Sequence, residues 1–279
     1  MSKFILSAFA DEASPLFYEQ IDAMRESGIT HLEMRGVNGR NISSMTREEV
    51  RCAKYMLDQA GLSVWSIGSP VGKIKISDPF GPHLDSFKRL LDAAVTCEAS
   101  VMRIFSFYDV KTDADKAEAI ARLQTLVETA KGSGVLLCHE NEKGIYGDTA
   151  ENCVEILSAV PELGSVFDPA NFIQCGVDPL TAWGMLADKT TYLHIKDALK
   201  DGKVVPAGCG LGNLPSIIAD FGARGGKVLS LEPHLTVFKG LADLEEDQKT
   251  DIDPYSYPSA REAFRVAANA VKDIVEQIG

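Results

Sequence analysis

The sequence predicts an α/β protein that folds as a single (β/α)8 TIM barrel. Its 279 residues are close to the roughly 250 residues that such a barrel needs. Short apolar segments alternate with segments of helical pattern along the whole chain, which is typical of parallel strands joined by crossover helices. Because eight such pairs occur, a closed barrel is favoured over an open, doubly wound sheet.

The eight candidate strands are short and mostly continuous apolar runs. Such runs are expected where helices cover one side of a strand and the other side faces a packed barrel interior. In chain order they are Phe4–Phe9, His31–Met34, Ser63–Ile67, Val101–Phe107, Val135–Glu140, Ser165–Asp168, Tyr192–Lys196 and Val228–Glu232.

Capping signals mark the helices between these runs. The segment Asp113–Ala130 has an amphipathic pattern with Leu123 and Leu126 on its apolar face, together with Ile120 and Val127. Glycines that can end a helix in the left-handed conformation occur at Gly28, Gly61 and Gly132. Helix starts are predicted at Ser14-Pro15, Thr46–Glu49, Asp148–Glu151, Asp178-Pro179 and Ser259–Glu262.

We expect one domain over residues 1–279, because no linker or low-complexity tract interrupts the pattern. The longest irregular segment, residues 235–258, follows the eighth strand. Two interpretations of it stay open: a lid or binding loop at the carboxyl face of the barrel, or a solvated acidic loop. The glycine-rich segment Ala207–Gly212 lacks the strand–loop–helix context of a dinucleotide-binding fold.

Composition limits the partners. The net charge of −12 and the pI near 4.9 disfavour a nucleic acid, whose phosphates would be repelled. No run approaches the roughly 20 apolar residues of a membrane span, and the first residues lack a secretory pattern. None of the six cysteines forms a CxxC pair. We therefore expect a cytoplasmic protein with free thiols, acting on a small molecule, with a homo-oligomer left open.

Four successive runs end in a residue that can bind a metal. Glu140, Asp168, His194 and Glu232 are 28, 26 and 38 residues apart, close to the roughly 30 residues of a strand and its crossover helix. The four side chains should therefore meet at the carboxyl edge of neighbouring parallel strands. A set of three carboxylates and one imidazole suits one divalent ion such as Mn²⁺, Mg²⁺, Co²⁺ or Zn²⁺.

Five motifs stand at or near these residues: His139–Glu142 continuing to Ile145–Asp148, Phe167–Asn171, His194–Asp197, Val205–Gly208 and Leu231–His234. In these motifs the whole chain resembles the sugar-phosphate isomerase/epimerase-like TIM barrels of the xylose isomerase-like superfamily. That superfamily includes ketose 3-epimerases, inosose dehydratases and endonuclease IV. The resemblance implies that Glu140, Asp168, His194 and Glu232 bind one divalent cation.

Proton transfer is the chemistry that we expect. A divalent ion makes the α C–H of a bound hydroxyketone acidic, and Glu140 and Glu232 could then remove and return a proton through a metal-stabilised enediolate. The predicted function is a metal-dependent isomerase or epimerase of a sugar, sugar phosphate or keto-sugar. The alternative is a lyase or dehydratase acting on a keto-sugar or inosose. An endonuclease-like function is disfavoured by the charge and by only five histidines, and a sugar-binding barrel without activity by the presence of Glu140 and Glu232.

Further polar residues near strand ends are candidates for substrate binding: Lys196, Asn171, Arg103, Trp65, Glu33 and His234. Lys196 could bind an oxyanion or phosphate, or pair with Asp197. Asn171 stands where ketose 3-epimerases have a substrate-binding histidine, so the resemblance breaks there. His139 precedes a ligand, so strand alternation predicts a structural role for it on the helix side.

Overall fold

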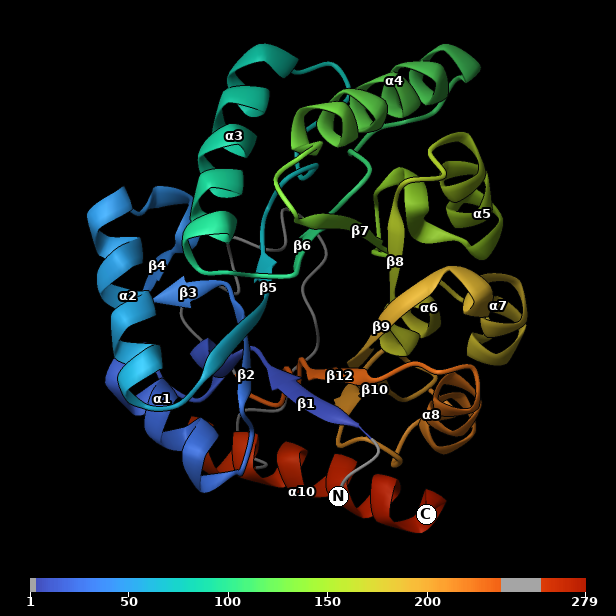
Figure 1. Cartoon of the computed structure of the whole chain (residues 1–279). Coiled ribbons are helices and arrows are strands. Elements are labelled where there is room, and N and C mark those ends of the chain that lie inside the picture. Colours follow the sequence, from blue (N-terminus) through green and yellow to red (C-terminus); the bar gives the residue numbers. More distant parts are fainter. Residues whose placement is uncertain (1–3, 237–256) are drawn as a thin grey trace.

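We describe a computed structural model of the chain for residues 4–236 and 257–279. Eight strands close into a barrel in the order β1-β12-β9-β8-β7-β6-β5-β2, and every pair is parallel (Figure 1). The predicted (β/α)8 fold is confirmed. The strands are β1 (Ile5–Ala8), β2 (His31–Met34), β5 (Ser63–Gly68), β6 (Val101–Ile104), β7 (Leu136–Glu140), β8 (Gly164–Phe167), β9 (Thr190–Ile195) and β12 (Val228–Leu231).

Helices surround the barrel in Figure 1, and the C-terminal helix packs against α8 and α1. The α-helices are α1 (Phe17–Glu26), α2 (Arg47–Gln59), α3 (Phe80–Thr96), α4 (Asp113–Ala130), α5 (Ala150–Ala159), α6 (Pro169–Gln174), α7 (Pro179–Leu186), α8 (Leu214–Ala223) and α10 (Ala260–Ile278). Short elements complete the description: the hairpins β3 (Gly36–Val37)/β4 (Arg40–Asn41) and β10 (Asp197–Ala198)/β11 (Val204–Val205), and the 3₁₀ turns η1 (Ala10–Glu12), η2 (Ile42–Ser44), η3 (Tyr146–Asp148) and η4 (Ala187–Lys189).

Most of the predicted boundaries agree with the structure. Thr46 and Glu49 form a capping box, and Asp178 and Ser259 cap α7 and α10. Gly28, Gly61 and Gly132 follow their helices with φ of 59°, 70° and 79°.

Several boundaries differ from prediction, most strand ends by one or two residues. The N-cap of α5 is Thr149 rather than Asp148. The first helix has Leu16 at its N-cap, and Ser14 Oγ accepts a hydrogen bond from the Leu16 N–H instead. Strand β6 ends at Ile104 rather than Phe107, because Phe105 and Phe107 donate their N–H groups to Val71 and Gly72 in a loop.

Strand alternation divides the barrel interior into an apolar end and a polar end. Near the strand starts, Val101, Cys138, Val166, Tyr192 and Val228 form a small cluster against Trp65. Glu140, Asp168 and His194 each come two residues after a member of this cluster. A period of two therefore places their side chains on the same, interior side. The chemistry-bearing side chains thus lie at the carboxyl ends of the strands.

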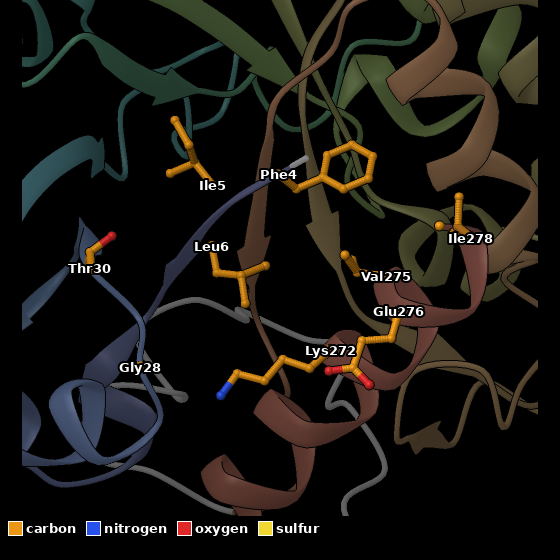
Figure 2. Close-up of a pocket in the computed structure, with 10 residues that line it drawn as sticks. Phe4, Ile5, Leu6, Gly28, Thr30, Lys272, Val275, Glu276 and Ile278 are labelled. Atoms are coloured by element: carbon orange, nitrogen blue, oxygen red, sulfur yellow. The ribbon is translucent and has the colours of Figure 1, made fainter. Parts of the chain in front are cut away.

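A cavity of about 610 Å³ opens at the opposite end of the barrel. Figure 2 shows that its lining comes from the start of β1 and from α10, with Phe4, Ile5, Leu6 and Val275 among its side chains. It contains none of the candidate ligands. Most of the predicted loop 235–258 falls outside the described residues, and among the described helices none has the length and hydropathy needed to cross a bilayer.

Candidate metal centre

The structure brings together the four residues predicted as ligands. One potential ligand atom from each of Glu140, Asp168, His194 and Glu232 lies within 4.8 Å of the others, and all four side chains are buried. Glu140 and His194 belong to β7 and β9, whereas Asp168 and Glu232 directly follow β8 and β12. These four strands are neighbours in the barrel.

His194 faces this cluster with Nδ1. That nitrogen lies 3.0 Å from Glu140 Oε1, 3.4 Å from Glu232 Oε2 and 3.9 Å from Asp168 Oδ2. The other ring nitrogen, Nε2, lies 3.2 Å from Glu33 Oε2. Glu33 also accepts hydrogen bonds from Tyr192 and Ser230. A carboxylate behind a histidine in this way fixes the ring orientation and leaves Nδ1 for a metal.

The spacing of the donor atoms fits a divalent ion. Ligand atoms about 2.1 Å from one ion lie roughly 3.0–3.4 Å apart in octahedral or tetrahedral geometry. The distances from His194 Nδ1 to Glu140 and Glu232 fall in this range. The donor set of one nitrogen and three carboxylates is also one that Mn²⁺, Co²⁺ or Zn²⁺ accepts. The residues present therefore fit a metal ion.

Three buried cations compensate the carboxylates. Arg103 Nη1 lies 2.5 Å from Glu140 Oε2, Lys196 Nζ lies 2.9 Å from Asp168 Oδ2 and 3.0 Å from Glu232 Oε2, and Arg35 Nη1 lies 3.1 Å from Glu232 Oε1. Lys196 pairs with these two carboxylates and not with Asp197. Buried charges are tolerated when they are paired in this manner.

Burial and charge together set the protonation of the cluster. Burial raises the pKa of Glu140, but His194 and Arg103 outweigh it and bring this pKa down to about 2. Burial raises the pKa of Asp168 to about 7, with Glu232 and Glu140 adding to it against Lys196. Burial lowers the pKa of His194, but Glu140 and Glu33 outweigh it, so this pKa lies well above 6.5. The cluster thus favours a positive charge at the imidazole, which a metal ion could replace.

The sequence of this chain matches the model of a known protein family. The model of the xylose isomerase-like TIM barrel family matches residues 21–253. The chain belongs to this family. No curated protein matched the sequence.

Solved structures share the fold of this chain at low identity. L-ribulose 3-epimerase has a TM-score of 0.75 and 16% identity over 100% of this chain and 96% of its own. The probable 3-DHS dehydratase AsbF of Bacillus anthracis has a TM-score of 0.73 and 16% identity, over 96% and 98%. The IOLI protein, solved with a bound zinc atom, has a TM-score of 0.73 and 16% identity, over 100% and 99%. At such identities the likeness shows the fold alone, and these relatives include both an epimerase and a dehydratase.

Asn171 and His234, which are predicted to bind substrate, lie beside the four candidate ligands. Asn171 Nδ2 donates to Glu140 Oε1 over 3.3 Å and to the Asn141 carbonyl over 2.9 Å. His234 Nε2 lies 3.7 Å from Glu232 Oε1 and 3.5 Å from Glu12 Oε1. Both residues therefore adjoin the cluster, as Lys196 and Arg103 do.

Two of the predicted substrate contacts are not supported by their positions. Trp65 lines a hollow with Thr190, Lys227 and Val228, where β9 and β12 begin, so it lies at the far end of the barrel. Glu33 is fully buried and supports His194 from behind. Strand alternation did not reveal either position, because it predicts the side of a strand that a residue faces, whereas Trp65 lies near the start of β5 and Glu33 contacts His194 on β9.

His139 has the structural role that was predicted from its place directly before Glu140 in the strand. It is buried, and its Nε2 lies 3.0 Å from Ser106 Oγ. Burial lowers its pKa to about 4, so the ring is neutral at pH 7. A side chain at Gly147 would collide with this ring, since an added Cβ would stand 2.3 Å from His139 Cε1.

Asp197 organises the glycine-rich segment. Its carboxylate accepts hydrogen bonds from the N–H groups of Gly208, Gly210 and Gly212, at 2.9, 3.0 and 2.8 Å, and from its neighbour Ala198. An added Cβ at Gly210 would come within 2.3 Å of Asp197 Oδ1. Close approach of the backbone to a carboxylate, rather than phosphate binding, accounts for the glycines in this segment.

Asp11 and Glu12 are acidic residues beside the site that the sequence prediction did not include. Both bind Arg35, which in turn binds Glu232. They lie on η1, which one residue separates from the end of β1. An acidic pair after a predicted strand was therefore the available signal, the same one that pointed to the four candidate ligands.

Proposed function

We propose that this chain is a divalent-metal-dependent isomerase or epimerase of a sugar, sugar phosphate or keto-sugar. The convergence of Glu140, Asp168, His194 and Glu232 within 4.8 Å carries the proposal. It is supported by family membership and by the presence of two glutamates in the cluster.

The glutamates approach from two sides. Glu140 stands on β7 and Glu232 follows β12, and these strands are separated by β8 and β9 in the barrel. A divalent ion held by the cluster would supply Lewis acidity to a carbonyl and its neighbouring hydroxyl. One glutamate can then accept the α proton of a substrate between them, and the other can return a proton on the opposite side.

Neighbouring cations and amides provide substrate contacts in this proposal. Arg103 is buried, and among the described residues its Nε and Nη2 have no hydrogen-bond partner; a substrate oxygen that enters beside Glu140 would supply one. Lys196 is placed to stabilise an oxyanion beside Asp168 and Glu232. Asn171 and His234 lie on the other sides of the glutamates.

One observation favours a lyase as the second candidate. The Lys196 ammonium lies among the candidate ligands and can give a proton to a leaving hydroxyl, which elimination requires and epimerisation does not. The proton removed first would be the same in both reactions. The dehydratase among the structural relatives is compatible with this candidate.

Turnover in deuterium oxide tests the proposal. Metal-loaded protein is incubated with a panel of keto-sugars, their phosphates and an inosose, and the products are followed by NMR and ultraviolet absorbance. Deuterium at a carbon next to the carbonyl, with no absorbing product, supports an isomerase or epimerase. Formation of a conjugated enone supports the lyase instead. Absence of exchange and of product over the whole panel, with metal bound, contradicts both.

A further inference from the structure

A second cluster of ligand-type residues adjoins the candidate metal centre. Potential ligand atoms of Glu12, Glu232 and His234 lie within 4.8 Å of one another, and all three residues are buried. Glu232 belongs to both clusters. Its Oε2 faces His194 and Lys196, whereas its Oε1 faces Arg35 and His234. The two clusters therefore share a carboxylate that could bridge two ions.

Arg35 lies in this second cluster. Its guanidinium contacts Glu12 Oε1 at 3.0 Å, Glu232 Oε1 at 3.1 Å, and both carboxylate oxygens of Asp11 at 2.9 and 3.0 Å. The side chain is 2% exposed, and the ring of Phe9 covers it at 4.2 Å. A guanidinium so enclosed keeps its charge and has a fixed fork of donors.

A divalent ion and this guanidinium compete for the same oxygens. Oε1 of Glu12 and Oε1 of Glu232 both bind Arg35. The other oxygens are also occupied, since Glu12 Oε2 accepts the His234 N–H and Glu232 Oε2 contacts Lys196. The two positive charges would also repel each other where little water can screen them. The guanidinium of Arg35 thus neutralises the carboxylates of Glu12 and Glu232, as a second metal ion would.

We propose that Arg35 is the built-in cation of the Glu12–Glu232–His234 cluster. It limits the centre to one divalent ion and holds Oε1 of Glu232, so that Oε2 is the oxygen presented to that ion. Arg35 is a positioning residue in this scheme. The inference rests on the proposed function, because it assumes that the first cluster binds a metal.

Manganese stoichiometry tests the inference without an activity assay. Wild type and the variants Arg35→Lys and Arg35→Gln are purified in Mn²⁺, freed of excess ion, and measured for metal content and by electron paramagnetic resonance. We expect one isolated ion in wild type and in Arg35→Lys. Arg35→Gln should hold two ions with a spin-coupled signal, since they would share Glu232. Adding Glu12→Gln to Arg35→Gln should return the content to one.

The outcomes separate the two proposals. Two coupled ions in wild type, or a single ion in folded Arg35→Gln, overturn the role of Arg35 and leave the proposed function standing. A wild type that binds no ion overturns the proposed function and this inference with it. Should Arg35→Gln not fold, the variant Asp11→Asn/Arg35→Gln carries the same expectation of two ions, because it removes a carboxylate with the guanidinium and keeps Glu12, Glu232 and His234.

Discussion

The ammonium of Lys196 lies 2.9 Å from Oδ2 of Asp168, one of the four candidate metal ligands. It also contacts Glu232 Oε2 at 3.0 Å, so two ligand oxygens are shared between a lysine and any bound ion. The lysine therefore opposes metal binding electrostatically while it stabilises the metal-free cluster. Its substitution should separate these two effects.

Lys196→Met should tighten metal binding and slow turnover. Repulsion between a divalent ion and an ammonium about 4 Å away is on the order of 8 kcal/mol at an effective dielectric constant of about 20. Relaxation will remove much of this, and we expect Mn²⁺ to bind at least roughly tenfold more tightly by calorimetry, about 1.4 kcal/mol. Lys54→Met, on a surface pair with Asp58, is the control with the same charge change. Weaker Mn²⁺ binding in Lys196→Met would contradict the expectation.

Metal affinity should rise with pH through neutrality and beyond. The pKa of His194 lies well above 6.5 and that of Asp168 is about 7, so in the metal-free protein His194 is protonated at neutral pH and Asp168 is partly protonated. The ion must displace these protons, and lower pH therefore favours the metal-free form. Calorimetry in buffers of different ionisation enthalpy should detect proton release near pH 7. An affinity that is constant between pH 6 and pH 8 would argue against His194 and Asp168 as ligands.

Glu33→Gln should weaken metal binding without unfolding the barrel. The carboxylate of Glu33 orients His194 through Nε2, at 3.2 Å. Loss of such an outer partner typically reduces metal affinity by roughly 10–100-fold. Circular dichroism checks the fold, and Glu118→Gln on α4, which pairs with Arg122, matches the charge change away from the site. Equal affinities of the two variants would show that Glu33 does not orient the ligand.

Glu232→Gln should slow proton exchange into the substrate by roughly 10²–10⁴-fold, the usual contribution of a general acid or base. The amide keeps the size and one oxygen but loses the basicity. Metal content is measured on the same sample, because Glu232 is also a proposed ligand. Exchange that is lost while metal is retained supports the proton shuttle. Full activity with metal retained would rule out Glu232 as an essential base and favour the lyase that relies on Lys196.

Asp197→Ala should destabilise the fold through the glycine-rich segment. Its carboxylate accepts N–H groups from Gly208, Gly210 and Gly212, of which the bond to Gly212 is buried and the other two are partly buried. A buried donor left without a partner costs about 1–3 kcal/mol, and a partly buried one costs less. We expect the free energy of unfolding in urea to fall by roughly 2–4 kcal/mol. Asp201→Ala, at an exposed turn where Asp201 accepts the Lys203 N–H, should change it by less than about 0.5 kcal/mol. Similar losses in both variants would contradict this role.

Periodicity and spacing within the chain were enough to predict the barrel and the four candidate ligands. Each strand is a local apolar run, and alternation places the residue two positions after Cys138, Val166 or Tyr192 on the interior side. Parallel strands then bring their carboxyl ends to one face. For this reason Glu140, Asp168, His194 and Glu232 could be grouped before any contact was known, and the helix caps at Thr46, Asp178 and Ser259 could be read locally.

Closure of the barrel decided which side chains from distant parts of the sequence meet at the site. The contact between Glu33 and His194 joins residues 161 positions apart, and that between Arg35 and Glu232 joins residues 197 positions apart. Both pairs meet because the sheet closes: β1 joins β2 to β12, which Glu232 follows, and β9 with His194 is the next strand. The register between β2 and β5 likewise shifts after Leu32, so that Glu33 pairs with Ser66. A local pattern determines which side of a strand a residue faces, but which distant side chain shares its charge depends on how the strands are ordered and registered in space.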